Sequence, residues 1–424
     1  MRILVYPHDL RLGGSQLNAI ELGAAVQRLG HDVLLFGQPG PLAQTAVELG
    51  LEYVPAPLPG KRPSPTVISA LVRTVRERGV DVLHGYEWPP ALECLAASKV
   101  VRGITAVATV MSMAVAPFIP KSMPLMVGTE QIHHWESSRG RGEVHVMEPP
   151  VDTHANQASA TVGLDAFTRK FALADRSLTV VCVSRLAQEL KLEGLMSAMD
   201  AVRLLSLEHP VRLIITGTGP ASDAVASRAA LINAATGRET VTLTGELADP
   251  RPAYAAADVV LGMGGSALRG LSFGKPLVVQ GERGFWELLT PDSLPTFLWQ
   301  GWYGSGPGSG GEGQNALLAI LRALMNDEQL RRDLGVLGRQ VVEQRYSLDS
   351  AARRQVRLYE DFAAARPGLA ATMASEVAAI GRYAGYVGKR RSQRVLRRLP
   401  RDDFNARPVA SHAAGPGLHV ARGV

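Results

Sequence analysis

Along the chain, the order of apolar and polar residues alternates between two patterns. Short apolar runs such as Arg2–Tyr6 (RILVY) fit buried strands, whereas Gly13–Leu29 carries its apolar residues at helical spacing. GHDVLLFG, which begins at Gly30, has the pattern of a second strand, and Val67–Gly79 that of another helix. Strands that alternate with helices predict parallel sheets covered by helices.

The same alternation begins again in the second half of the chain. Leu178–Val183 is a β-branched run typical of a buried parallel strand, and helical spacing returns in Leu192–Met199. Further strands are predicted at Val211–Ile215 and Leu277–Gln280, whereas 287–313 is rich in Gly, Ser and Pro and predicts a loop. A chain of 424 residues is too long for one small core, so we expect two domains.

Composition indicates a globular protein. Hydrophobic residues make up 46% of the chain and the mean hydropathy is +0.05, and no apolar run is long enough to span a bilayer. The first residues, MRILVYPHDL, have no cationic region or cleavage site, so we expect no signal peptide and a cytoplasmic protein. Cys94 and Cys182 lie in apolar periodic segments, which predicts buried thiols in a reducing compartment.

The positive charge is concentrated at the end of the chain. The net charge is +6, of which the residues from Lys389 onward contribute +7 and the rest −1. A nucleic-acid-binding fold carries its charge on a packed face, so we expect no nucleic acid partner. The segment Lys389–Arg401 is either a solvated cationic helix or a contact for an anionic membrane surface or an acidic partner.

Two cations lie between the strand Leu178–Val183 and the helix that follows it. Arg185 and Lys191 are placed where free N–H groups and the helix dipole favour an anion. Two neighbouring cations suit a diphosphate better than a single carboxylate. The alternative is that both are solvated loop charges.

Glycine turns mark the starts of three other helices. DLRLGGSQ precedes the first helix, Thr216–Pro220 (TGTGP) follows a strand, and Gly262–Ser266 precedes a helix predicted over Ala267–Phe273, which Ser266 is placed to cap. Such turns let the backbone approach a ligand closely, although an ordinary strand–helix turn has the same composition. The first turn lacks the full GxGxxG fingerprint with its spaced acidic residue, which disfavours a dinucleotide enzyme.

In this order and spacing, the motifs resemble those of the family-4 glycosyltransferases over about Met1–Ala365. That family has a Gly-Gly turn followed by a long helix and G-H-x-V, an Arg-Leu pair followed by a Lys, and a G-x-G-P turn. Arg185-Leu186 with Lys191 and Gly217–Pro220 match the last two, and VHVMEPPVD matches the usual exit from the first domain. The resemblance implies an α/β protein of GT-B fold, with two Rossmann-like, doubly wound parallel-sheet domains facing a cleft.

The resemblance also implies an assignment of domains. Residues 1–170 would form the N-terminal acceptor domain and 171–345 the C-terminal domain that binds the nucleotide-sugar donor. Residues 346–366 would form a helix that crosses back to the first domain, and 367–424 a basic helical tail with a disordered end.

Site residues follow from the same resemblance. In the family the Arg and Lys hold the donor diphosphate, which assigns Arg185 and Lys191 here to the catalytic site. The remaining matched positions lie in the loop that faces the donor phosphate and acceptor, in the G-x-G-P turn, at the strand exit that contacts the base through backbone groups, and around the donor-site helix. They are Gly13, Gly14, Ser15, Gly217, Thr218, Gly219, Leu247, Gly264, Gly265, Ser266 and Arg269.

Two positions depart from the family pattern. Relatives open the donor-site helix with a carboxylate that holds the ribose hydroxyls, where this chain has Arg269; an earlier acid is also missing. A guanidinium donates only, so Arg269 would reach a phosphate instead, and Glu282 is the nearest acid that could take over sugar recognition. The strand that usually ends in a His ends in Thr109–Met113 (TVMSM), and His84, His133 and His134 do not match that position.

We therefore expect a retaining glycosyltransferase that moves a sugar from a nucleotide-diphosphate sugar to a small-molecule, lipid or glycan acceptor. No cofactor or metal is expected, because fixed cations do the work of a metal. The enzyme would be cytoplasmic, with peripheral attachment at the inner face of the membrane as an option. Two alternatives stay open: a catalytically silent nucleotide-binding partner subunit, and a sugar-nucleotide epimerase of the same fold.

Overall fold

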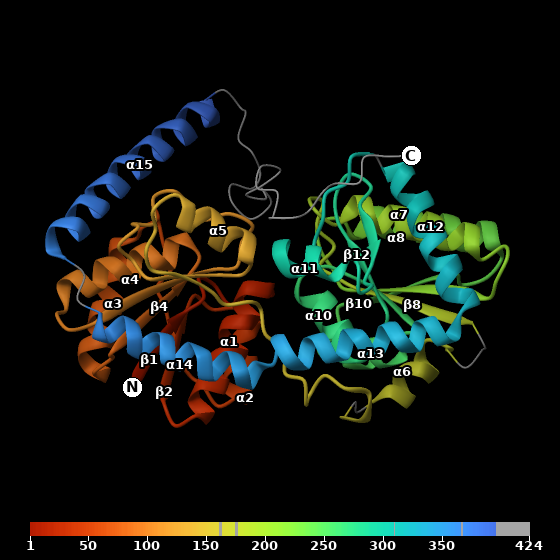
Figure 1. The fold of residues 1–424 in the computed structure, drawn as a ribbon, viewed down its shortest axis with the longest axis horizontal. Coiled ribbons are helices and arrows are strands. Elements are labelled where there is room, and N and C mark those ends of the chain that lie inside the picture. The colour runs from red at the N-terminus through yellow and green to blue at the C-terminus, as the bar shows by residue number, and fades with distance from the viewer. Residues whose placement is uncertain (161–162, 174–176, 309, 366–367, 396–424) are drawn as a thin grey trace. The chain divides into compact units, whose positions relative to one another are not determined.

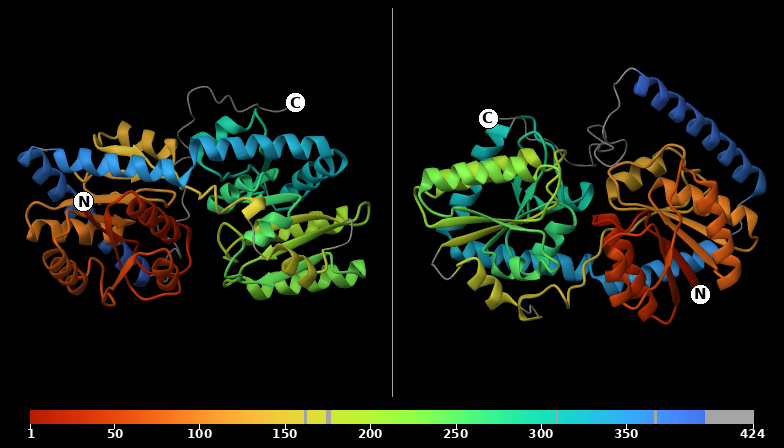
Figure 2. Two further views of the ribbon diagram at one scale, coloured as in Figure 1. Left: turned by 90° about the horizontal axis from the view of Figure 1, so that it is seen from below. Right: turned by 180° about the vertical axis from the view of Figure 1, so that it is seen from behind.

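The computed structural model describes residues 1–160, 163–173, 177–308, 310–365 and 368–395. Contacts divide the chain into two compact units, Met1–Pro150 with the chain from Leu348 onward, and Val151–Ser347. Each unit has its own sheet covered by helices (Figures 1 and 2). The expected α/β fold with two Rossmann-like parallel sheets is confirmed.

The first unit contains a seven-stranded, wholly parallel sheet in the order β3-β2-β1-β4-β5-β6-β7. Its strands are β1 (Arg2–Tyr6), β2 (Asp32–Gly37), β3 (Glu52–Pro55), β4 (Val82–Tyr86), β5 (Thr105–Val110), β6 (Leu125–Val127) and β7 (Val144–Val146). Ile3 of β1 pairs with Val33 on one side and with Val82 on the other. The strand order therefore reverses beside β1, which in open α/β sheets is where ligands bind.

Alternate residues of β1 face two different cores. Ile3 and Val5 pack with α1 and α14, whereas Leu4 and Tyr6 pack with α3 and α4. Helices thus cover both faces of the sheet, as the continuous apolar strands require. The helices of this unit are α1 (Gly14–Arg28), α2 (Leu42–Glu48), α3 (Pro65–Arg78), α4 (Trp88–Val100), α5 (Glu130–Ser138), α14 (Leu348–Ala364) and α15 (Leu369–Val395).

The second unit contains a six-stranded sheet in the order β10-β9-β8-β11-β12-β13. Its strands are β8 (Leu178–Val183), β9 (Val211–Thr216), β10 (Val241–Gly245), β11 (Val259–Gly262), β12 (Leu277–Gln280) and β13 (Trp286–Leu288). Only the edge strand β13 is antiparallel, pairing with β12. The carboxyl ends of the other five strands therefore lie along one edge of the sheet.

Helices cover both faces of the second sheet as well. Val180 and Cys182 pack against α7, α8 and α12 on one face, whereas Val181 packs with α9 and α10 on the other. The helices are α6 (Leu164–Lys170), α7 (Leu192–Leu205), α8 (Ser222–Thr236), α9 (Arg251–Ala256), α10 (Gly265–Ser272), α11 (Leu294–Gln300), α12 (Gly310–Asn326) and α13 (Glu328–Arg345), with a short 3₁₀ helix at Ala158–Ala160.

Two segments differ from the sequence expectation. The described residues of 151–170, placed by sequence at the end of the first domain, pack with the second unit, because Phe167 is buried beside Ala253 and Tyr254. The expected loop 287–313 contains the end of β13, the helix α11 and the start of α12. Phe297 and Trp302 are buried and their stacked ring centroids lie 5.5 Å apart, so aromatic packing orders a stretch whose Gly and Ser content predicted a loop.

The last helices belong to the first unit. α14 packs against α1, and its Tyr359 hydroxyl lies 2.6 Å from His84 Nδ1. Within the described part of the chain, no helix has the length and apolar character needed to cross a membrane.

Candidate functional site

The second-half residues singled out by sequence lie along one edge of the second sheet. The segments holding Arg185, Gly217–Gly219, Leu247, Met263–Ser266 and Glu282 follow the carboxyl ends of β8, β9, β10, β11 and β12 respectively. Since these five strands are parallel, their exits meet at the same edge. Leu247 is partly buried against the core below. The structure therefore assembles these residues into one region.

The loop after β8 is fixed by its backbone. Leu186 N donates to Thr218 O at 2.9 Å, and Ala221 N donates to Leu186 O at 2.9 Å. The Leu186 side chain is buried in the core. Arg185 is exposed, and among the described residues its guanidinium has no carboxylate partner. The backbone thus presents this cation at the sheet edge without pairing it.

Lys191 is at the N-cap position of α7, without a side-chain cap, and is partly buried. Its Nζ lies 3.1 Å from Met263 Sδ in the turn before α10, and Gln280 Nε2 donates to Lys191 O at 3.1 Å. Burial lowers the pKa of Lys191 to about 8, and the Cys182 thiol beside it opposes that shift. No carboxylate of the described chain pairs with this ammonium. A partly desolvated cation without an anion is strongly suited to bind one.

Glycines are required in the turn after β9. A Cβ atom on Gly219 would lie 2.4 Å from Leu186 O, and one on Gly217, whose φ is +134°, would lie 2.0 Å from Ser184 O. Between them, Thr218 Oγ1 donates to Glu246 Oε2 at 2.9 Å. The turn therefore packs directly on the Arg185 loop, and the two loops form one backbone unit.

The turn before α10 also depends on glycine. Gly264 has φ +58° and donates its N–H to Trp302 O at 2.7 Å. The expectation that Ser266 caps this helix is wrong: α10 begins at Gly265, and Ser266 Oγ bonds back to Met263 O at 3.0 Å. The space beside Gly265 is open except for Arg269, whose Nη1 lies 3.9 Å from the position of a Cβ. Arg269 thus lies beside the first turn of its own helix.

Glu282 is held by the neighbouring loop. The Tyr303 hydroxyl donates to Glu282 Oε2 at 2.8 Å, and Glu282 N donates to Gly304 O at 3.0 Å. Burial and the Glu282 carboxylate raise the pKa of Tyr303, so that tyrosine stays a donor. Glu193, in the first turn of α7, accepts from Gly284 N at 2.7 Å. Hydrogen bonds from the protein therefore orient Glu282, which is half-buried, and Glu193, which is exposed.

In the first unit, Gly13, Gly14 and Ser15 form the start of α1. Gly13 is its extended N-cap without a side-chain cap, and Gly14 has open space around it. Ser15 Oγ donates to Glu87 Oε1 at 3.2 Å. The chain therefore places this turn against a carboxylate that the sequence reading did not single out.

Glu87 receives four hydrogen bonds at the carboxyl end of β4. Besides Ser15, Oε1 accepts from Met111 N at 3.0 Å and Ser112 N at 3.2 Å, and Oε2 accepts from Ser112 Oγ at 2.7 Å. Burial raises its pKa despite these bonds. Glu87 has φ +65°, a strained backbone position for a residue with a side chain. The sequence signal that could have identified Glu87 is its position between the end of strand β4 and the start of helix α4.

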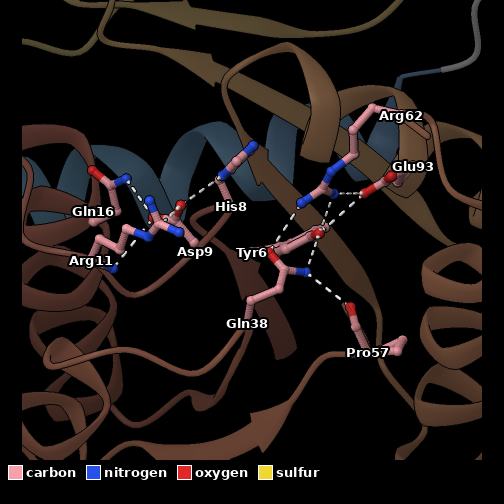
Figure 3. Close-up of polar contacts among 9 residues, drawn as sticks. All are labelled: Tyr6, His8, Asp9, Arg11, Gln16, Gln38, Pro57, Arg62 and Glu93. Carbon is pink, nitrogen blue, oxygen red and sulfur yellow. Dashed lines mark hydrogen bonds and ion pairs between the residues drawn. The ribbon is translucent and has the colours of Figure 1, made fainter. Parts of the chain in front are cut away.

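A second polar network lies at the same edge (Figure 3). Arg62 Nη1 pairs with Glu93 Oε2 at 2.5 Å, and Tyr6 donates to the same oxygen at 3.1 Å. Gln38 Nε2 donates to Tyr6 Oη at 3.0 Å. Glu93 is wholly buried, so its charge is balanced by the guanidinium that reaches it.

Asp9, which follows β1, is similarly supported. The His8 ring lies 3.5 Å from the Asp9 carboxylate and Gln16 Nε2 donates to it at 3.2 Å (Figure 3). The bond from His8 lowers the pKa of Asp9 to about 2. His8 has φ +78°. Asp9 therefore stays charged at the first sheet edge.

Backbone strain concentrates at these two edges. Of the five non-glycine residues with positive φ in the described chain, His8, Glu87, Leu190 and Arg283 directly adjoin site segments. The exception is Ala172. Strain of this kind persists where surrounding contacts impose it, often at functional sites.

His84 and the two cysteines have structural surroundings. His84 is buried between Tyr359 Oη and Thr109 Oγ1, each at 2.6 Å, and burial lowers its pKa to about 3. His133 and His134 lie on α5. Cys94 and Cys182 are buried and free, which confirms the expectation from their apolar segments. The described residues contain no group of three or more His, Cys, Asp or Glu arranged to hold a metal ion.

Two family models match the chain, one in each half. Residues 13–140 match the family described as "Glycosyl transferase 4-like domain", and residues 177–294 match "Glycosyl transferases group 1". Together they cover more than half of the chain. No curated protein matches it.

Solved structures share the fold over most of the chain. A glycosyltransferase from Rickettsia africae ESF-5 has a TM-score of 0.68 at 14% identity, covering 86% of this chain and 99% of its own. Anabaena Alr3699/HepE, solved with UDP and glucose, has a TM-score of 0.66 at 14% identity, covering 85% and 99%. WaaG, a glycosyltransferase involved in lipopolysaccharide biosynthesis, has a TM-score of 0.58 at 14% identity, covering 85% and 99%.

Proposed function

The chain is a GT4-like glycosyltransferase of GT-B fold, and from this premise we propose that it transfers a sugar from a nucleotide-diphosphate sugar to an acceptor hydroxyl with retention of configuration. The donor would bind the second unit and the acceptor the first. Arg185 and Lys191 would hold the diphosphate. The acceptor class stays a small molecule, a lipid or a glycan.

The unpaired cations at the edge of the second sheet carry this proposal. Lys191 is partly desolvated without a carboxylate partner, and Arg185 is exposed in a loop fixed by Thr218 and Ala221. Two cations within one backbone unit match the charge of a diphosphate. The Anabaena relative was solved with UDP and with UDP-glucose, which favours the same donor class.

The proposed chemistry rests on electrostatic stabilisation of the leaving group. When the bond from the anomeric carbon to the diphosphate oxygen breaks, negative charge grows on that oxygen, and Lys191 and Arg185 would stabilise it. The N–H groups at the glycine-rich start of α10 would add to this effect. We propose that these fixed groups take the place of a metal ion and that no other cofactor is needed.

The remaining site residues take positioning roles in this proposal. Gly217, Thr218 and Gly219 would support the diphosphate loop, and Leu247 would adjoin the base. Gly264, Gly265 and Ser266 would bring backbone close to the donor.

Two charged residues would complete the donor site. Arg269, which lies beside Gly265, would donate to a donor phosphate in place of the ribose-binding carboxylate. Glu282, oriented by Tyr303, would accept from sugar hydroxyls.

In the first unit, Gly13, Gly14 and Ser15 would face the donor phosphate and the acceptor. We further propose a cytoplasmic enzyme whose basic segment Lys389–Arg401 contacts an anionic membrane surface or an acidic partner. Residues 396–401 of that segment lie outside the described residues.

Thermal unfolding with UDP, GDP and dTDP tests the donor class. A nucleotide at about a hundred times its dissociation constant adds roughly 2.7 kcal/mol of stability, which is a clear shift. We expect one of the three to stabilise the protein, and Arg185→Ala with Lys191→Ala to abolish the effect. Arg203→Ala, which removes a cation from the far end of α7, is the matched control and should leave it unchanged.

Two results would contradict the proposal. If none of the nucleotides stabilises the protein, the altered Arg269 helix does not support donor binding. If a nucleotide binds equally well without Arg185 and Lys191, the diphosphate site lies elsewhere. Once a donor is found, the anomeric configuration of the product, read by NMR, tests retention.

A further inference from the structure

The helix α15 is attached to the first unit along one face. Tyr383 and Tyr386 pack against Phe118, with ring centroids 5.3 and 4.9 Å away, and Ala379 is buried. Arg382 Nη1 donates to Pro117 O at 2.9 Å, and Tyr383 Oη donates to Arg62 O. These contacts fix which side of α15 faces the unit and which side faces outward.

The outward side carries a row of large apolar residues. Leu369, Met373, Val377 and Ile380 are 57–76% exposed and follow one another at intervals of four, four and three residues. This spacing places them on one face of the helix. α15 lies on the outside of the first unit (Figure 1). A continuous apolar row of this kind on a surface helix marks a contact site.

The row is exceptional for this chain. The described residues include fourteen large hydrophobic residues that are exposed, and five of them, the four above and Val395, lie on α15. Elsewhere such residues are scattered singly or in pairs, as with Leu58 and Leu231. The concentration on one helix therefore needs its own explanation.

The charge of α15 is strongly one-sided. Its only acid is Glu376, which is neutralised by Lys99 at 2.6 Å. Its basic residues are Arg382, Lys389, Arg390, Arg391 and Arg394. From Lys389 onward the chain has a net charge of +7. An apolar row followed by a cationic end is the composition of a helix that lies on an anionic bilayer.

We propose that the outward face of α15 docks on a lipid bilayer with anionic headgroups. The row Leu369–Ile380 enters the headgroup–acyl boundary, and the basic end pairs with lipid phosphates. A second copy of the chain is a poorer occupant, because another α15, whose only acid is paired with Lys99, offers no anionic group to the basic end. This inference deepens the membrane contact included in the proposed function by naming its surface, and it commits to lipid over an acidic protein.

Vesicle sedimentation tests the docking surface with the full chain. The vesicles contain phosphatidylglycerol and phosphatidylcholine in equal parts, or phosphatidylcholine alone. We expect binding to the first and much weaker binding to the second. Val377→Gln with Ile380→Gln should weaken binding at least about tenfold, because two apolar side chains no longer leave water. Lys389→Gln with Arg391→Gln should also weaken binding, and added salt should have less effect on that variant.

Val47→Gln with Leu58→Gln is the matched control, since it removes two exposed apolar side chains from another part of the same unit. It should bind as the unmodified chain does. Equal binding by the α15 row variant and by this control would overturn the proposal, as would the absence of binding to anionic vesicles. Sedimentation velocity that shows a dimer separated by the row variant would assign the face to a second copy instead.

The nucleotide assay keeps this test independent of the donor proposal. Val377→Gln with Ile380→Gln should keep the thermal stabilisation by nucleotide, because α15 lies outside the second unit. Vesicle binding without nucleotide stabilisation would support this inference and count against the donor proposal. Nucleotide stabilisation without vesicle binding would support the donor proposal and count against this inference.

Discussion

The carboxyl edges of the two sheets are built from the same kind of strand–helix units, yet their charged side chains are paired differently. At the first edge, carboxylates are abundant and satisfied: Glu87 accepts four hydrogen bonds, and Glu93 is paired with Arg62. At the second edge, Lys191 and Arg185 are cations without a carboxylate partner in the described chain.

This difference separates a preorganised surface from an incomplete one. At the first edge, hydrogen bonds and an ion pair hold the charged side chains in fixed positions. Such an arrangement is suited to orient the hydroxyl groups of a bound substrate. At the second edge, Glu193 and Glu282 accept hydrogen bonds from the protein, whereas the cations Lys191 and Arg185 have no carboxylate partner in the described chain and can pair with a bound anion. In the proposed function, the two α/β units would divide the work of a two-substrate reaction through the side chains at their strand ends.

Removal of both cations is expected to produce the largest effect. Arg185→Ala with Lys191→Ala should lower kcat/KM by about a thousandfold or more, because charge-assisted contacts to the leaving group are lost. Steady-state transfer assays with the identified donor check this. If Arg62→Ala at the first edge lowered nucleotide affinity by the same amount, both edges would bind the anion. That result would contradict the proposed difference between them.

Gly219→Ala should be next in size, acting on stability. The added Cβ would lie 2.4 Å from Leu186 O, a backbone atom that cannot move aside cheaply. We expect a loss of about 3 kcal/mol in the free energy of unfolding of the second unit, measured in urea. Gly311→Ala on α12, with no atom within 4 Å, is the control and should not destabilise the protein. Equal stability of the two variants would contradict the tight contact between the loops.

Glu87→Gln should affect the first edge alone. An amide offers one acceptor oxygen in place of two, so one of the four donors loses its partner, at a cost of about 2 kcal/mol. We expect slower transfer with unchanged nucleotide stabilisation. Ser112→Ala, which removes one donor, should have a smaller effect. A loss of nucleotide binding in Glu87→Gln would contradict the expectation that this substitution affects the first edge alone.

The pH dependence of nucleotide affinity should show the smallest effect. Lys191 has a pKa of about 8 in the folded protein, so it is charged below that pH and neutral above it. Affinity should fall by up to about tenfold per unit as pH rises above 8. Stability of the free protein should instead rise between pH 8 and the ordinary lysine pKa of 10.5, because there the unfolded chain binds the extra proton.

Lys191→Arg separates these two pH effects. A guanidinium stays charged throughout this range, so the fall in affinity above pH 8 should disappear. Isothermal titration calorimetry between pH 7 and about 9.5 measures it. An unchanged pH profile in Lys191→Arg would assign the titration to another group.

The sequence determined the fold because its signals are local. Apolar runs such as Leu178–Val183, each followed by helical spacing, specify parallel α/β units whatever their partners, and both sheets formed as expected. The positions of Arg185 and Lys191 were also fixed by local order, since a residue that follows a parallel strand must lie at its carboxyl edge.

Only the tertiary structure decided which side chains are paired. Glu87 gave no separate motif, and its role depends on donors contributed by Ser15 and by Met111–Ser112, segments distant in sequence. Phe167 likewise joins the second unit through contacts with Ala253 and Tyr254, which no local pattern encodes. Strand spacing fixes where a residue lies along an edge, but hydrogen bonds, ion pairs and burial are set by long-range packing. Those contacts decide whether a charge is satisfied or left to bind a ligand.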